Sequence, residues 1–212
     1  MVSDRINSFM KHRYLTIERE YGAGGTEIAR LISKKTGVSC YGREILELVS
    51  KKHGISIEDI ERYEESAKSS LFYSIFAVQQ VYSTKPDMLD KEGHIFIAEQ
   101  NIIEQLADSH SQAVFIGHCA SEALAGREGV IKVFIRCSDE AKKKKRITDV
   151  YHIAPEHAEA ERRFYDRKRA NYYNINTGHS WKDSENYDIC IDDAHLSPEE
   201  CASMLSTFFN EE

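Results

Sequence analysis

The fold is decided by the stretch Leu15-Thr16-Ile17-Glu18-Arg19-Glu20-Tyr21-Gly22-Ala23-Gly24-Gly25-Thr26-Glu27-Ile28-Ala29. It begins with the apolar pattern of a buried strand, passes through three glycines and ends in a helical pattern. Glycines let the backbone turn tightly and expose successive N–H groups, and the helix that follows presents the positive end of its dipole. The stretch therefore predicts a phosphate cradle formed by Gly22, Ala23, Gly24 and Gly25, with the Thr26 hydroxyl placed to reach a magnesium ion.

Half of the usual nucleotide-binding pattern GxxxxGK[ST] is missing from this cradle. The register begins at Arg19 and ends at Thr26, so that Gly24 and Thr26 match, whereas Arg19 replaces the first glycine and Gly25 replaces the lysine. The lysine normally neutralises charge on the β- and γ-phosphates, so Arg19, Arg30 or a distal arginine has to supply that charge here. A purely structural strand-to-helix turn is the alternative.

Further strands and helices alternate along the chain. Apolar runs predict buried strands at residues 113–116, 130–135 and 187–191, in addition to 14–17. Helical patterns cover residues 27–35, 43–52, 91–108, 138–149, 155–174 and 198–209. The last helix is expected to turn Met204, Leu205, Phe208 and Phe209 inward. This alternation predicts an α/β fold with a mainly parallel sheet covered by helices on both faces.

Length and charge limit the classes of protein that the chain can represent. Its 212 residues, 41% of them hydrophobic, fit a single domain, and a net charge of -7 argues against binding to nucleic acid or an anionic membrane. No stretch approaches the roughly 18 apolar residues of a membrane span, and no signal peptide is recognisable. Five widely spaced cysteines predict free thiols. We therefore expect a cytoplasmic protein.

Residues 54–110 differ from the rest because they are helical and polar, with an aromatic run at 71–76. We interpret them as a helical insertion over the carboxyl edge of the sheet. The core would then comprise about 13–53 and 111–209. An exposed face of Phe72 and Phe76 is the candidate contact of a homodimer.

Several segments together resemble the cytidylate kinase-like family. Besides 15–29 they are Tyr41-Gly42-Arg43-Glu44-Ile45, residues 114–120, residues 172–178 and residues 187–191, in the expected order across about 13–209. The resemblance implies a P-loop NTPase fold with three α/β/α layers, a five-stranded parallel sheet, a monophosphate-binding insertion and a mobile lid at about 150–180. Members of the family commonly carry a lysine-free REYGSGG-type loop, which here reads REYGAGG.

The acceptor side departs from the family at one position. His118 stands after Gly117, where the family usually has arginine, and a neutral imidazole grips phosphate less firmly than a guanidinium does. His118 is thus either a weaker, pH-dependent phosphate ligand or a hydrogen-bonded strand-end residue. Arg43 is either a contact to the acceptor phosphate or an ordinary residue of a first helical turn.

A cluster of arginines resembles the lid of cytidylate kinases. The resemblance makes Arg163, Arg167 and Arg169 candidate catalytic cations, and Asp166 can hold arginines one turn away. The lysine run at 142–145 is more simply interpreted as a solvated helix face. Beyond the lid, Trp181 is either a residue that flanks the nucleotide base or part of a packed turn.

Three functions fit these observations. The leading hypothesis is transfer of the γ-phosphoryl group of ATP, with Mg²⁺, to a small phosphorylated or hydroxyl acceptor, by resemblance a pyrimidine monophosphate. The second is a nucleotide-sensing module that has lost catalysis, which the missing lysine and His118 would favour. The third is a P-loop sulfotransferase, for which the sequence offers no acceptor-side base.

Overall fold

A computed structural model describes residues 13–66 and 91–209. Its sheet has five strands in the order β2-β3-β1-β4-β5, and every neighbouring pair is parallel. The strands are β1 (Tyr14–Arg19), β2 (Ser39–Tyr41), β3 (Ala113–Ile116), β4 (Val130–Arg136) and β5 (Ile189–Asp192). This five-stranded parallel sheet confirms the α/β fold class expected from the sequence.

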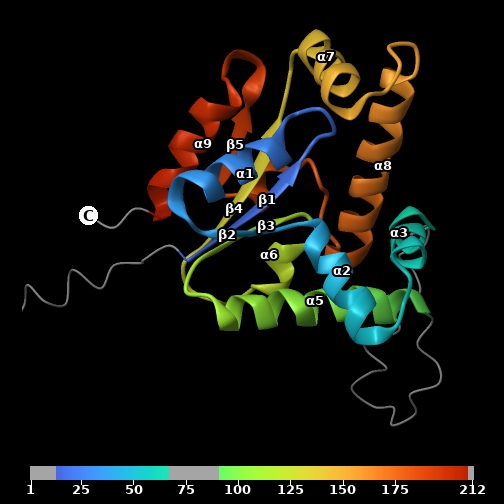
Figure 1. The fold of residues 1–212 in the computed structure, drawn as a ribbon, viewed down its shortest axis with the longest axis vertical. Coiled ribbons are helices and arrows are strands. Elements are labelled where there is room, and N and C mark those ends of the chain that lie inside the picture. The colour runs from blue at the N-terminus through green and yellow to red at the C-terminus, as the bar shows by residue number, and fades with distance from the viewer. Residues whose placement is uncertain (1–12, 67–90, 210–212) are drawn as a thin grey trace, which may run out of the picture.

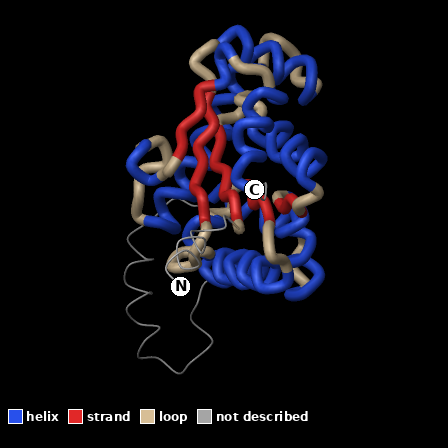
Figure 2. Tube along the Cα trace, turned by 90° about the vertical axis from the view of Figure 1, so that its left-hand side faces the viewer, coloured by secondary structure: helices blue, strands red, loops and turns tan. Residues whose placement is uncertain are grey.

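Helices cover both faces of the sheet (Figure 1). Figure 2 shows the strands side by side in red, with helices in blue around them. The helices are α1 (Gly25–Thr36), α2 (Arg43–His53), α3 (Ile57–Ser66), α5 (Lys91–Ser109), α6 (Ala120–Ala123), α7 (Glu140–Tyr151), α8 (Ala158–Thr177) and α9 (Pro198–Ser206). Helices α1, α2, α5, α7, α8 and α9 begin and end within a few residues of their predicted bounds. Helix α3 lies in the predicted helical insertion, and α6 was not predicted. The largest shifts are at both ends of α8, which was predicted at 155–174, and at the end of α9, which was predicted at residue 209.

Two apolar clusters, one on each face, hold the layers together. Alternate residues of a strand point to opposite faces, so Leu15 and Ile17 pack with α1 and α9, whereas Tyr14 packs with α2, α5 and α8. Phe115 of β3 is fully buried in the second cluster. Burying both faces of parallel strands accounts for their nearly continuous apolar sequence.

The inward stripe predicted for the last helix is correct for Leu205 and Phe209, which are buried, and wrong for Met204. Met204 is 53% exposed, and the 3₁₀ turn that follows α9 brings Phe209 into the core. Ser197 and Glu200 form the predicted capping box.

Part of the expected insertion lies outside the described residues. This part comprises residues 67–90 and includes Phe72 and Phe76, so the homodimer contact stays a prediction. Within the described residues, α3 lies beside α8, and α5 packs against α2 and α6. None of the helices described is long and apolar enough to cross a membrane.

Candidate active site

The glycine loop joins β1 to α1 at the carboxyl edge of the sheet. Gly22 and Gly24 have φ values of 83° and 72°, a region that favours glycine. A Cβ atom at Gly24 would also lie only 2.9 Å from Cζ of Arg146. Gly24 caps α1, whose first N–H groups have no acceptor within the helix. The loop thus has the backbone that an anion cradle requires.

Arg19 lies across this loop in close contact with two glycines. A Cβ atom added at Gly25 would be 2.6 Å from Cβ of Arg19, and one added at Gly117 would be 2.3 Å from Nη1 of Arg19. The side chain therefore runs from the start of α1 toward the end of β3. A lysine at position 25 would collide with Arg19, so the cation and the glycine of the usual pattern have exchanged places.

Helix α8 is fastened to the same loop by polar contacts. Asp166 is 8% exposed and accepts a hydrogen bond of 2.7 Å from the backbone N–H of Tyr21. Burial raises the pKa of Asp166 above its usual value. Arg169 donates from Nη1 to the carbonyl oxygen of Arg19 at 2.9 Å. The lid segment and the glycine loop therefore form one connected unit.

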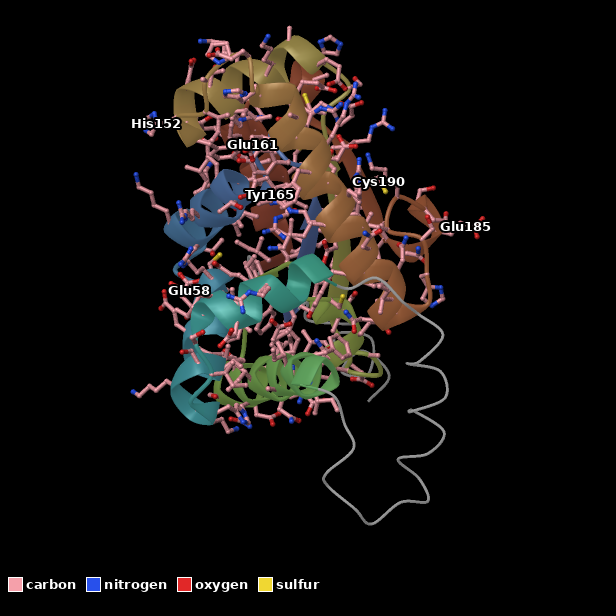
Figure 3. All side chains as sticks on the ribbon, turned by 90° about the vertical axis from the view of Figure 1, so that its right-hand side faces the viewer. Glu58, His152, Glu161, Tyr165, Glu185 and Cys190 are labelled. Carbon is pink, nitrogen blue, oxygen red and sulfur yellow. The ribbon has the colours of Figure 1, made fainter. Side chains whose placement is uncertain are left out.

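Aromatic contacts strengthen this connection. The ring of Tyr21 stacks on that of Tyr165 in α8, with centroids 4.6 Å apart and planes inclined by 14°. Tyr151 at the end of α7 lies 4.9 Å from Tyr21 on a tilted plane, and the guanidinium of Arg169 lies 5.5 Å from the centroid of the Tyr21 ring. Figure 3 labels Tyr165 on the stretch of α8 above α3. Burial raises the pKa of Tyr21 to about 12.

The two other lid arginines lie elsewhere. Arg163 and Arg167 are exposed, and Arg163 donates from Nε to Glu159 at 2.5 Å. Hydrogen bonds from Arg162 and Arg163 lower the pKa of Glu159 to about 2. Arg162, not Arg169, pairs with Asp166, at 3.4 Å. Of the three candidate catalytic arginines, the structure brings only Arg169 to the glycine loop.

Helix α7 contributes contacts that sequence reasoning missed. Lys143 is 3% exposed and pairs with Glu20 at 3.3 Å, so its interpretation as a solvated residue was wrong. Arg146 donates from Nη1 to the carbonyl oxygen of Gly22 at 2.7 Å and to Asp193 at 3.1 Å. The only sequence signal for Arg146 was its place at the end of a basic run, because its partners are 47 and 124 residues away.

The site holds a cavity of about 480 Å³ beside the loop. Its charged lining comprises Glu18, Arg19, Arg43, Glu61, Lys168 and Arg169, together with His118. A second cavity of about 360 Å³ is lined by Thr26 and Arg30, and Arg19 and Arg43 line both. Arg43 also pairs with Glu61 at 3.6 Å, largely in solvent. The structure thus gathers Arg19, Thr26, Arg43 and His118 around adjoining space.

Trp181 belongs to the core, not to a nucleotide site. It is 1% exposed, and its Nε1 donates to Glu18 at 3.0 Å. Its ring meets Phe134 edge-on at 5.3 Å. The interpretation of Trp181 as a residue that flanks the base was therefore wrong, and the packed turn is the correct alternative.

Comparisons with solved structures agree with this architecture. An uncharacterized protein from Eubacterium ventriosum is 22% identical, with a TM-score of 0.68 over 94% of this chain and 99% of that chain. Shikimate kinase from Bacteroides thetaiotaomicron is 12% identical, with a TM-score of 0.50 over 92% and 96%. At such identities the likeness shows the fold alone. No curated protein matches the chain.

A family model accounts for the sequence itself. The match covers residues 14–195, from β1 to the turn after β5, and so includes the glycine loop, the cavity and α8. It spans more than half of the chain and agrees with the strand order of the sheet. The chain belongs to the cytidylate kinase-like family.

Proposed function

We propose that this protein transfers the γ-phosphoryl group of ATP to a small acceptor, with Arg19 serving in place of the P-loop lysine. Membership of a kinase-like family makes phosphoryl transfer the general class of reaction. The observation that supports the specific proposal is the position of Arg19, whose side chain crosses the glycine loop and reaches the end of β3. We also propose that the protein acts in the cytoplasm.

The donor side of the proposal rests on the loop. Backbone N–H groups of Gly22, Ala23, Gly24 and Gly25 would face the phosphates, as in other helix-terminus anion sites. Thr26 lines a cavity together with Arg19, so its hydroxyl fits a Mg²⁺ ion carried by the nucleotide. The ion would neutralise charge shared by the β- and γ-phosphates.

The acceptor side of the proposal lies across the larger cavity. Arg43 and His118 line it and would contact the acceptor, which by family is a pyrimidine monophosphate such as CMP, or another small compound. The positive charge of Arg169 would stabilise the negative charge on the phosphoryl group as it is transferred. Arg163 and Arg167 line neither of these two cavities, and their catalytic role stays a prediction.

The test measures ADP formation from Mg-ATP with a panel of nucleoside monophosphates and hydroxyl acceptors, beside ATP binding by calorimetry. Arg19→Ala should weaken ATP binding by about 10- to 100-fold, because a hydrogen bond to a charged group contributes about 1.5–3 kcal/mol. Arg62→Ala removes an exposed arginine of α3 that lines neither cavity and should leave the affinity unchanged.

Either of two results would contradict the proposal. Unaltered ATP affinity in Arg19→Ala would exclude Arg19 as the substitute for lysine. Firm ATP binding without ADP formation from any acceptor would instead identify a nucleotide-sensing module.

A further inference from the structure

A buried carboxylate lies behind the acceptor cavity. Glu99 of α5 is 0% exposed, and one of its oxygens accepts a hydrogen bond from the hydroxyl of Tyr172 in α8. Its other oxygen, Oε1, lies 3.6 Å from Nδ1 of His118. Carboxylates are almost never fully buried without a partner, so this placement requires an explanation.

The backbone of His118 is also held in place. His118 has a φ of 57° and Cys119 one of 49°, so two successive residues other than glycine adopt the left-handed conformation. Such conformations cost about 1–3 kcal/mol each and persist where the surroundings enforce them. The neighbour of Glu99, Gln100, donates to the carbonyl oxygen of His118 at 2.9 Å. Two adjacent residues of α5 thus fix one histidine.

The histidine also lies beside the proposed site of transfer. His118 lines the same cavity as Arg19 and Arg169. The preceding residue, Gly117, lies directly beneath the guanidinium of Arg19, where a Cβ atom would be 2.3 Å from Nη1. A group in transfer that Arg19 contacts would therefore lie near the imidazole.

A histidine oriented by a buried carboxylate suits one kind of acceptor. A hydroxyl group must lose its proton as it attacks phosphorus, and a histidine beside it serves as the general base. A nucleoside monophosphate needs no base, because the second pKa of a phosphate monoester is about 6 and the attacking oxygen is already ionised. A phosphate acceptor calls only for cations, which Arg43 and Lys168 in the cavity wall would supply. A histidine base has a role only when the acceptor is a hydroxyl.

From this geometry we infer that His118 is the catalytic base for a hydroxyl acceptor and that Glu99 is its positioning residue. The inference rests on the proposed function. The acceptor oxygen forms a bond to the γ-phosphorus of ATP, and its proton passes to Nε2 of His118. The bond from the γ-phosphorus to the bridging oxygen breaks, and ADP leaves with the electron pair. Glu99 stabilises the imidazolium through Nδ1. Arg43 and Lys168 on the cavity wall favour an acceptor with an acidic group elsewhere.

Water is the hydroxyl probe for the first experiment, because a base that activates an acceptor hydroxyl also activates water. Hydrolysis of Mg-ATP should fall about 100-fold or more in His118→Gln, the usual contribution of a general base. Glu99→Gln should reduce it about tenfold, with the KM for ATP unchanged. His157→Gln replaces an exposed histidine at the start of α8 and should hydrolyse ATP at the wild-type rate.

A second readout does not depend on activity. The ring of His118, assigned by NMR from the signal missing in His118→Gln, should titrate at lower pH in Glu99→Gln, because a neutral amide no longer favours the imidazolium. Glu99 lies beside the ring, and Glu44 of α2 interacts electrostatically with it. The other charged groups that line the same cavity are Glu18, Arg19, Arg43, Glu61, Lys168 and Arg169. A purely structural role of Glu99 would leave this titration unchanged in a folded variant.

The outcomes separate this inference from the function on which it rests. Wild-type protein that fails to bind ATP would overturn the proposed kinase function. Wild-type protein that binds ATP without hydrolysing it would overturn only the base, as would undiminished hydrolysis in His118→Gln. Faster ADP formation with CMP than with water, unaffected by His118→Gln, would overturn the hydroxyl acceptor in favour of a monophosphate.

Discussion

At the scale of single residues, the pair formed by Arg19 and Gly25 explains how a phosphate loop can lack its lysine. The two positions face each other so closely that only one of them can carry a long side chain. In the usual pattern the first position is glycine and the seventh is lysine, and here the order is reversed. The exchange keeps one cation at the loop and brings it in from the strand instead of the helix.

Because only one of positions 19 and 25 can carry a long side chain, the effects of substituting both should not be additive. Gly25→Lys should destabilise the protein by about 1–3 kcal/mol, the usual cost of overpacking, and Arg19→Gly should weaken ATP binding. The double variant should be more stable and bind ATP more tightly than the two separate losses imply, with a coupling energy of about 0.5–3 kcal/mol. Thermal unfolding and calorimetry measure both quantities. Strictly additive losses would show that the two positions are independent.

At the scale of elements, α8 and the glycine loop are joined through Asp166 and Tyr21. The contact combines a partly buried hydrogen bond between Tyr21 and Asp166 with the stacked rings of Tyr21 and Tyr165. Tyr21 belongs to the glycine loop, and both of its partners belong to α8. Neither Tyr21 nor Asp166 alone suggests the contact, since 145 residues separate them. A movement of α8 would therefore also displace the loop that is proposed to hold ATP.

Asp166→Ala tests this connection. Removing the acceptor leaves the N–H of Tyr21 unsatisfied in a partly buried place, which costs about 1–3 kcal/mol. Amide hydrogen exchange at Tyr21 should become about 10-fold faster or more. Arg163→Ala changes an exposed residue of the same helix and should leave that exchange rate as it is. Equal exchange rates at Tyr21 in Asp166→Ala and wild type would mean that the hydrogen bond does not protect the loop.

At the scale of the whole molecule, the fold follows from sequence more completely than the site does. Strands and helices leave local periodic signals, so the parallel sheet and its covering helices are predictable. Burial of a charged residue leaves none: Lys143 is buried because Glu20, 123 residues earlier, lies beside it. The role of Glu99 could not be predicted from the sequence for the same reason, because only folding brings α5 next to the turn after β3. The candidate roles of Arg43, Arg163 and Arg167 remain predictions.

Glu20 connects three parts of the molecule and makes its stability depend on pH. Its carboxylate accepts hydrogen bonds from Lys143 of α7 at 3.3 Å and from Lys182, beyond α8, at 2.6 Å. Burial alone would raise the pKa of Glu20, but the hydrogen bond and charge of Lys182, together with Lys143, outweigh it, so the pKa lies below its usual value. A depressed pKa means that the folded state favours the ionised carboxylate.

The stabilisation from Glu20 is thus complete above the unfolded-state pKa of about 4.3 and is lost as the pH falls through the folded-state value. Urea unfolding from pH 7 down to pH 3 should show wild type more stable than Glu20→Gln at neutral pH, with the difference shrinking below about pH 4.5. Glu185→Gln, an exposed glutamate in the loop before β5, should follow the wild-type curve at every pH. A constant difference between wild type and Glu20→Gln across this range would show that Glu20 acts through packing and not through its charge.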